Sequence, residues 1–435
     1  MGGGRTNEPL SSMNVGGQAV LEGVMMRSPG ALAIALRQKD GRILVKDATW
    51  ASLAGKAKFL RWPFFRGALV FGEALYNGMA AMRFSAEQME IDQGDDESDA
   101  PRSGPSALSS ALLAPWLLAN AASDDPSHPP VPAPAPVPVS VPVSAPVSAP
   151  APAPVSAPVS APVPVPATAA APAQASRMGR IGVYLTMALG VVFALFVFKG
   201  LPHLLTWALT TALNTGITVA SPWFHLIDGA VKAAVFVGYI VLIGRLPDIK
   251  RVFEYHGAEH KVIWSWERGR GLTVAGAQAQ SRRHPRCGTS FLLIVILVSI
   301  AVFAATFPFL QRYVTFFDSS LLNALVYIVV KVPLMLPVAG IAYEIVRFSG
   351  RRAGQAWVRP LIWPGLAMQG LTTREPADDQ VEVALAALRR ALWRERVQAA
   401  GGAAGAPAGE VASYARAEDI PLPDSGIEAA FPAAA

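Results

Sequence analysis

Four long apolar runs constrain the fold of this chain more than any other feature. Each contains about 18–23 residues, which is the length that a helix needs to cross the hydrocarbon core of a bilayer. A fifth run, 204–219, is interrupted by Thr and Asn, so we expect an interfacial helix or part of an external loop there. The four runs are 181–201, 229–246, 291–310 and 321–343. They predict a membrane α-helical fold with about four transmembrane helices.

The distribution of basic residues predicts the orientation. The segment 245–290 is rich in Lys and Arg, whereas 202–228 and 311–320 together contain only Arg312. Because cytoplasmic loops are enriched in Lys and Arg, we predict a multi-pass protein of the cytoplasmic (inner) membrane with both termini in the cytoplasm. This orientation and contact with the lipid bilayer account for the net charge of +6, so no nucleic-acid partner is expected.

Low-complexity sequence separates the ordered parts. The stretch 126–173 is almost entirely Pro, Ala, Val and Ser, a composition that favours coil or polyproline II and cannot build a packed core. An acidic run before it extends the predicted disordered linker to 91–176, and the tail 396–435 is also predicted to be disordered. The Pro-rich part of the linker is a candidate binding segment for protein partners.

The soluble segments predict a small cytoplasmic α+β unit over 14–90. Two β-leaning runs, 31–38 and 42–50, flank Lys39-Asp-Gly41, which is a hairpin signal. A helical stretch follows, and a unit of this size is marginal alone, so it should dock on the cytoplasmic loop or the membrane face. The membrane domain 177–375 carries a cytoplasmic loop, 247–290, and an amphipathic helix of structural role is predicted over 376–395.

The segment 254–261, with the sequence Glu-Tyr-His-Gly-Ala-Glu-His-Lys, carries the strongest chemical signal. Residues four apart share one face of a helix, so His256 and His260 can reach one divalent metal ion, with zinc expected. Glu259 would lie beside them as a general base, as in the H-x-x-E-H pattern. Pro247 is predicted to begin this helix. A hydrogen-bonded network of His, Glu and Arg is the alternative, because buried polar groups need partners.

The third ligand stays open between His284, Cys287 and Glu344. Histidine and thiolate both suit zinc, and four protein ligands would make a closed structural site. Glu344 lies at the predicted cytoplasmic end of the last run, where an ion pair with Arg347 is the other interpretation. Cys287 is the only cysteine, so an intramolecular disulfide is excluded. It could also be a nucleophile activated by His284, or a small packing residue.

Several further polar residues are candidate site residues because they lie in or near unusual sequence motifs. The segment 16–27 pairs glycines with polar side chains, which is typical of a lip over a site or of a strand edge with a bulge. Lys331 falls near the middle of the last apolar run, where it could mark a transport path or act as a structural partner. The further candidates are Gln18, Glu22, Glu254, Arg286 and Lys331.

At these motifs the chain resembles the YqhQ family of bacterial membrane proteins, a family with a domain of unknown function whose members are predicted to be metal-dependent enzymes. Five blocks carry the resemblance in order: 16–27, 254–261, 284–290, 337–344 with Arg347, and 364–376. The resemblance covers about 14–90 and 177–393, and the linker between them departs from it. It implies a metal and an enzyme, but no substrate.

We therefore expect an integral membrane metal-dependent enzyme, hydrolase-like, with its centre at the cytoplasmic membrane face. Glu259 would be the catalytic base, and membrane-associated peptides or lipid-linked molecules are equally compatible substrates. The competing expectation is a non-enzymatic membrane scaffold or assembly factor whose His/Glu cluster is structural.

Overall fold

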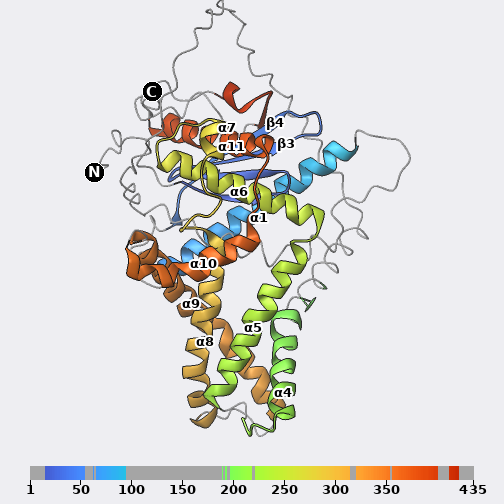
Figure 1. The fold of residues 1–435 in the computed structure, drawn as a ribbon, viewed down its shortest axis with the longest axis vertical. Coiled ribbons are helices and arrows are strands. Elements are labelled where there is room, and N and C mark those ends of the chain that lie inside the picture. Colours follow the sequence, from blue (N-terminus) through green and yellow to red (C-terminus); the bar gives the residue numbers. More distant parts are fainter. Residues whose placement is uncertain are drawn as a thin grey trace, which may run out of the picture.

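The computed structural model describes the parts of the chain that position the candidate site. These are residues 15–53, 62, 65–94, 189, 192–193, 196–217, 221–313, 320–352, 355–399 and 411–420. Figure 1 shows a head that contains a β-sheet, from which a group of long helices extends in one direction. The predicted linker 91–176 lies outside the described residues, apart from 91–94 at the end of a helix.

The head is built on an antiparallel sheet of five strands in sequence order. The run 16–27 forms a hairpin of β1 (Gly16–Val20) and β2 (Gly23–Arg27), and Val20 pairs with Gly23 across a two-residue turn. The hairpin predicted from the runs 31–38 and 42–50 is confirmed, and it consists of β3 (Ala31–Arg37) and β4 (Ile43–Thr49). Its Gly41 has a φ of +85°, which only glycine adopts readily.

The fifth strand corrects a prediction. Residues 411–420, inside the tail that we predicted to be disordered, form β5 (Val411–Tyr414) and the short 3-10 helix η6 (Ala417–Asp419). The strand pairs with β4, and Ala412, Tyr414 and Ile420 are buried. The composition of the tail hid this element because four residues suffice to extend an existing sheet, which supplies the hydrogen-bond partners.

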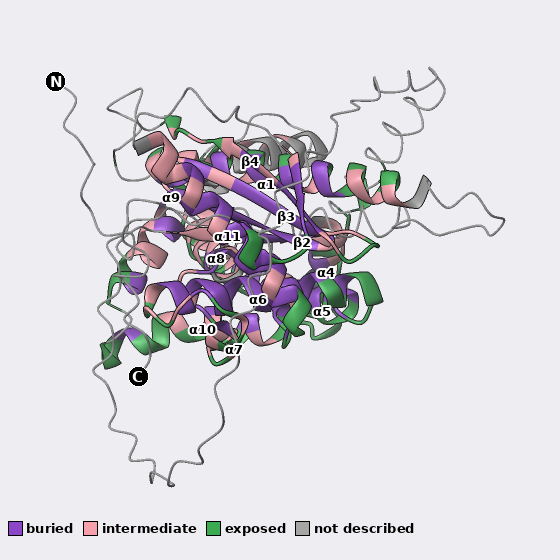
Figure 2. Cartoon of the chain, turned by 90° about the horizontal axis from the view of Figure 1, so that it is seen from above, coloured by how far each residue is buried: buried purple, intermediate pink, exposed green. Residues whose placement is uncertain are grey.

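Each face of the sheet is covered by different helices, as alternation of side chains along a strand requires. One set of inward residues, including Ala19, Ala33 and Val45, packs against α6 (Pro247–Glu267) and α11 (Asp378–Ala399). The other set, including Val20 and Ile34, packs against α1 (Phe65–Gly94). Figure 2 shows the strands and much of α6 and α11 coloured as buried. The predicted 14–90 unit is therefore part of one core with the 247–290 loop.

The predicted helix at 376–395 becomes α11, which begins two residues later, at Asp378, and is more than a surface helix. Its Arg390 and Arg394 both donate to the fully buried Asp47 of β4, Arg390 Nε at 2.9 Å from Oδ1. Arg390 also lies over the ring of Trp393, 4.2 Å from its centroid. A buried carboxylate with two guanidinium partners ties α11 to the sheet.

The stem contains α4 (Leu201–Ala212), α5 (Pro222–Ile243), α8 (Gly288–Tyr313) and α9 (Ser320–Arg351). Among the described residues, two helical stretches are long and apolar enough to cross a membrane: Pro222–Ile243 and Phe291–Leu310, with mean hydropathy 2.0 and 2.7. Only 28% and 17% of these windows are buried, unlike the core helix of a soluble protein. The protein is thus mostly helical, and its two exposed apolar helices suggest membrane association.

The other two predicted spans are described less completely. Most of 181–201 lies outside the described residues. The main part of this run that the structure describes is the π-helix η4 (Phe196–Gly200). The run 321–343 lies within α9, and many of its side chains, including that of Lys331, lie outside the described set. The interrupted run near 204–219 begins as α4, which packs beside α5.

One helix of the stem–head junction was not predicted. The helix α10 (Arg359–Thr372) packs against α8, and follows the short 3-10 helix η5 (Ala356–Val358). Its interior Pro364 and polar Gln369 obscure the helical pattern in the sequence. The short helix α7 (Val274–Gln278) lies in the loop between α6 and α8 and packs on α6. These elements place the loop 247–290 against the segment that follows α10.

Candidate metal centre

The helix α6 carries the centre, and it forms where the sequence predicts. Pro247 is its first residue, and Gly269, at a φ of +62°, follows its end. His256 and His260 lie one turn apart, with ring centroids separated by 4.4 Å. Cys287, directly before α8, meets them: its Sγ lies 3.2 Å from His256 Nε2. Within the described residues, one ligand atom from each of the three lies within 4.8 Å of the others, and all three residues are buried.

Backbone carbonyl groups orient both imidazole rings. His256 Nδ1 lies 2.9 Å from the carbonyl oxygen of Thr372, and His260 Nδ1 lies 2.7 Å from that of Arg282. A carbonyl can only accept, so each Nδ1 carries the proton and each Nε2 presents a lone pair. Metal-binding histidines are held in this way by an outer hydrogen bond. The buried Nε2 of His260 has no hydrogen-bond partner among the described residues, which is the feature that an ion would satisfy.

Burial keeps these imidazoles neutral. Desolvation lowers the pKa of His256 to about 4, with the hydrogen bond to Thr372 opposing the shift. The pKa of His260 falls well below its ordinary value, first because of burial and then because His256 and His284 lie close. Neutral imidazole is the form that binds a metal. The Cys287 thiol faces the lone pair of His256 Nε2, to which an S–H group can donate.

His284 lies beside the cluster of His256, His260 and Cys287, but its side chain contacts Glu267. Its Nε2 is 3.3 Å from Glu267 Oε2, and its ring centroid lies 5.9 Å from that of His260. The fully buried side chain of Gln369 accepts from His284 N and donates to His284 O, both at 2.7 Å. Arg286 also pairs with Glu267. These contacts hold the 284–287 segment so that its last residue reaches the centre.

Glu259 lies on the adjoining face of α6, against β1. It is 5% exposed, and a methyl group at Gly17 would approach its Cγ to 2.7 Å. The glycine-rich hairpin and the H-x-x-E-H segment, far apart in sequence, therefore meet at this carboxylate. Gln18 points to the other face of the sheet, where its buried amide has no hydrogen-bond partner among the described residues and Gly78 of α1 leaves room for it.

The remaining candidates make contacts that position elements. Glu344 accepts from Arg66 Nε at 2.6 Å and from Arg66 Nη2 at 2.5 Å, whereas the two interpretations open from the sequence were a metal ligand and a pair with Arg347. Glu22, in the β1–β2 turn at a φ of +53°, forms an ion pair with Arg251 of α6. Glu254 accepts from Gln380 of α11 at 3.1 Å. The structure thus brings Cys287 to the histidines, while Glu22, Glu254 and Glu344 join helices or strands.

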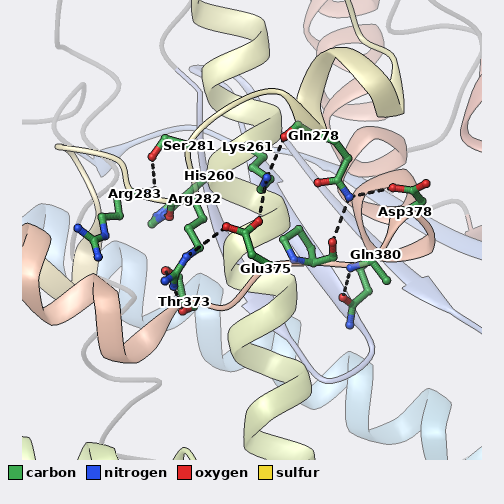
Figure 3. A network of polar contacts seen from close by, with 12 residues as sticks. His260, Lys261, Gln278, Ser281, Arg282, Arg283, Thr373, Glu375, Asp378 and Gln380 are labelled. Atoms are coloured by element: carbon green, nitrogen blue, oxygen red, sulfur yellow. Dashed lines mark hydrogen bonds and ion pairs between the residues drawn. The ribbon is translucent and has the colours of Figure 1, made fainter.

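The segment 372–376 was missed as part of the site, although it crosses α6 beside the histidines. Arg374 N donates to Phe253 O at 2.9 Å, and Lys261 Nζ lies 3.0 Å from Glu375 Oε2. Figure 3 shows Glu375 between Lys261 and Arg282, with Thr373 below. Thr372 and Arg282 accept hydrogen bonds from the histidines through their backbone oxygens. Every residue has a backbone oxygen, so the residue type cannot predict these contacts. The one sequence feature that pointed to the 372–376 segment was the 364–376 block of the family resemblance.

Gly257 makes this crossing possible, and it supplies a test. A methyl group there would lie 2.0 Å from Arg374 O, which is backbone and cannot move aside alone. We expect Gly257→Ala to lower the free energy of unfolding by about 1–3 kcal/mol, despite the helix propensity of Ala. Thermal unfolding in detergent measures the change.

Gly72 of α1 is the matched control, because a methyl group there would meet nothing within 4 Å. Gly72→Ala should stabilise the protein by up to about 1 kcal/mol. A Gly257→Ala protein as stable as the wild type would show that the 372–376 segment does not pack on α6 as described.

Comparison with known proteins agrees with the resemblance of the motifs. Residues 62–394 match the family model described as "Protein of unknown function (DUF1385)". The "Uncharacterized protein YqhQ" of Bacillus subtilis (strain 168) is 29% identical over 389 residues, which cover 87% of this chain and 92% of that protein. No solved structure matches. Because the family model spans most of the chain, including the three clustered residues, this chain belongs to the DUF1385 family.

Proposed function

We propose that this protein is a membrane-bound, metal-dependent enzyme of hydrolase-like activity, with zinc held by His256, His260 and Cys287. The observation that carries the proposal is the convergence of two oriented imidazole Nε2 atoms and one thiol in a buried site. Two His nitrogens and a Cys sulfur are a combination that zinc takes, and three protein ligands leave a fourth position open, as catalytic sites require. A bound zinc ion would supply Lewis-acid chemistry.

The residues around the centre would transfer the proton and hold the ligands in position. Glu259 precedes His260 in α6 and is buried against β1, and it would take a proton from the attacking group and hold it at a carboxylate oxygen. Gly17 would keep that carboxylate in place by its close approach. The carbonyls of Thr372 and Arg282 would keep both histidines in one tautomer. The buried surroundings would strengthen the electrostatic contacts of these residues, because few bulk water molecules would screen them.

We extend the proposal to topology: four spans in the cytoplasmic membrane, both termini in the cytoplasm, and the centre at the cytoplasmic face. Support comes from the position of the head at one end of α5 and α8. It also comes from the basic residues of 245–290, which lie at that end. Reporter fusions at each terminus should both show cytoplasmic activity, and a periplasmic signal at either one would contradict this topology.

Glu259→Gln tests the enzymatic proposal. We expect the variant to fold and to retain the metal, because Gln is isosteric and Glu259 is not among the clustered ligand atoms. Hydrolysis should fall by about 10²–10⁴-fold, which is the usual contribution of a general base. The assay is turnover of ester, phosphoester and peptide substrates by zinc-loaded protein in detergent. Glu254→Gln, on the same helix, is the control. Equal turnover by Glu259→Gln and wild type would refute the role of Glu259.

A scaffold is the second candidate, and one observation favours it. The three clustered residues join α6, the start of α8 and, through Thr372 O, the end of α10. An ion there would act as a staple between head and stem. In that case X-ray absorption should show four protein ligands on zinc, and Glu259→Gln should leave the cellular function unchanged. A ligand shell with one exchangeable position would favour the enzyme.

A further inference from the structure

A cavity of about 350 Å³ opens beside the metal centre, where the apolar helix α5 ends. Its walls come from the end of α5, from the loop before α8, and from the end of α10 with the segment that follows it. The lining residues are Ile240, Val241, Gly244, Arg245, Arg282, Gly370, Leu371, Thr373, Arg374 and Glu375. The function proposed above does not use this cavity.

The charge of the lining favours an anion. The lining contains three arginines and one carboxylate, so its formal charge is +3 − 1 = +2. The carboxylate, Glu375, lies 3.4 Å from Arg282 Nε. Backbone oxygens orient two of the three: Arg374 Nη2 donates to Gly244 O at 3.0 Å, and Arg282 donates to Thr373 O. The guanidinium of Arg245 makes no hydrogen bond or ion pair with another residue that the structure describes. Oriented guanidinium groups are the side chains that bind phosphate through paired hydrogen bonds.

Another part of the lining is apolar. Ile240, Val241 and Leu371 lie beside the arginines, and Val241 and Leu371 are 36% and 38% exposed. Arg245 follows the last residue of α5, a helix apolar enough to cross a membrane, by two positions. The cavity therefore offers a cationic wall and a lipophilic wall at the level where the apolar helix ends, which is the level of lipid headgroups.

The cavity also shares residues with the centre. Arg282 lines the cavity and also holds His260 with its carbonyl oxygen. Thr372, whose carbonyl oxygen holds His256, lies between two lining residues. Figure 3 shows Arg282 reaching toward Thr373 and Glu375, close to His260. A molecule in the cavity would thus touch the same segments that orient the histidines.

We propose that this cavity binds the phosphate group of an anionic lipid, with Arg245, Arg282 and Arg374 on the phosphate and the apolar wall against the start of the acyl chains. The phosphate contacts would not require the metal, because arginine is not a metal ligand, although the carbonyl oxygen of Arg282 also holds His260. The lipid site goes beyond the proposed function because it adds a second ligand and the residues that recognise it.

Arg245→Gln is the variant to test, because its side chain supports no other described residue. The full chain in detergent is titrated with phosphatidylglycerol, and binding is followed by native mass spectrometry and by intrinsic tryptophan fluorescence. We expect Arg245→Gln to weaken binding about tenfold or more, as loss of a charge-assisted contact does. Arg270→Gln removes an exposed charge that follows α6 and lies outside the cavity lining, so this variant should bind like the wild type.

Two further arms distinguish the possible sources of the phosphate. Phosphatidylcholine, whose headgroup is neutral overall, should bind much more weakly than phosphatidylglycerol. Soluble glycerol 3-phosphate should also bind much more weakly, because it cannot use the apolar wall. Equal binding of glycerol 3-phosphate and lipid would overturn the lipid assignment in favour of a soluble phosphate. Equal losses in Arg245→Gln and Arg270→Gln would overturn the site, since they indicate general attraction to positive charge.

Discussion

Replacement of His256 or His260 by alanine is expected to abolish metal binding. Wild-type protein purified in detergent without chelator should carry about one zinc ion per chain, as a three-ligand site holds. Each variant removes one of three clustered ligand atoms and should weaken affinity by more than about 100-fold, beyond the effect of losing an outer hydrogen bond. Elemental mass spectrometry of the purified proteins measures the stoichiometry. Cys287→Ser should show the same loss, because a hydroxyl is a poor zinc ligand.

His203→Ala is the matched control. His203 lies in α4 on the stem, its side chain is 55% exposed, and it is outside the cluster. This variant should keep the full metal content. Folded wild-type protein without metal would refute the metal centre, and metal retained in both His256→Ala and His260→Ala would place it elsewhere. Thermal unfolding of every variant shows whether a loss of metal reflects the ligand or a loss of the fold.

Replacement of Asp47 by alanine is expected to cause a large loss of stability. Asp47 is fully buried, and both of its oxygens accept from arginines of α11 that are 5% and 3% exposed. Without the carboxylate, two buried guanidinium groups lose the counter-charge that both of them contact. Breaking a buried ion pair in this way costs about 3–5 kcal/mol. The free energy of unfolding, followed by tryptophan fluorescence in urea, should fall by that amount.

Glu87→Ala is the control for Asp47→Ala. Glu87 pairs with Arg83 on the surface of α1, and their side chains are 52% and 82% exposed. An exposed pair four residues apart contributes only about 0.3–0.5 kcal/mol. Similar losses in the two variants would mean that Asp47 is not buried between the sheet and α11. Asp47→Asn should lie between them, because an amide still accepts a hydrogen bond but carries no charge.

Local signals made part of this fold predictable. The hairpin at 31–50 rests on a glycine at a positive φ between two β-leaning runs, and α6 begins at a proline and ends before Gly269. The pairing of His256 with His260 follows from the helical repeat alone. In each case the conformation is selected by interactions between residues only a few positions apart. The sequence pattern therefore predicts the conformation directly.

Other parts depended on contacts between distant segments. Sequence spacing could not choose among His284, Cys287 and Glu344, because the choice depends on how α8 and α9 pack. The strand β5 forms because β4 offers an unpaired edge, although its surroundings in sequence are typical of disorder. The helix α10 was hidden by a proline and gains its stability from packing on α8.

The sequence by itself determined the apolar helices, the helix that carries two histidines, and the glycine-rich turns, because hydrophobic periodicity and backbone sterics act over short distances. Only the tertiary structure decided that Cys287 meets the histidines, that carbonyls of Arg282 and Thr372 orient them, and that Gly17 packs on Glu259. These contacts join residues up to 242 positions apart (259 − 17), and backbone oxygens leave no trace in residue type. Close packing of helices, sheet and loop brings them together, and packing is a property of the whole chain.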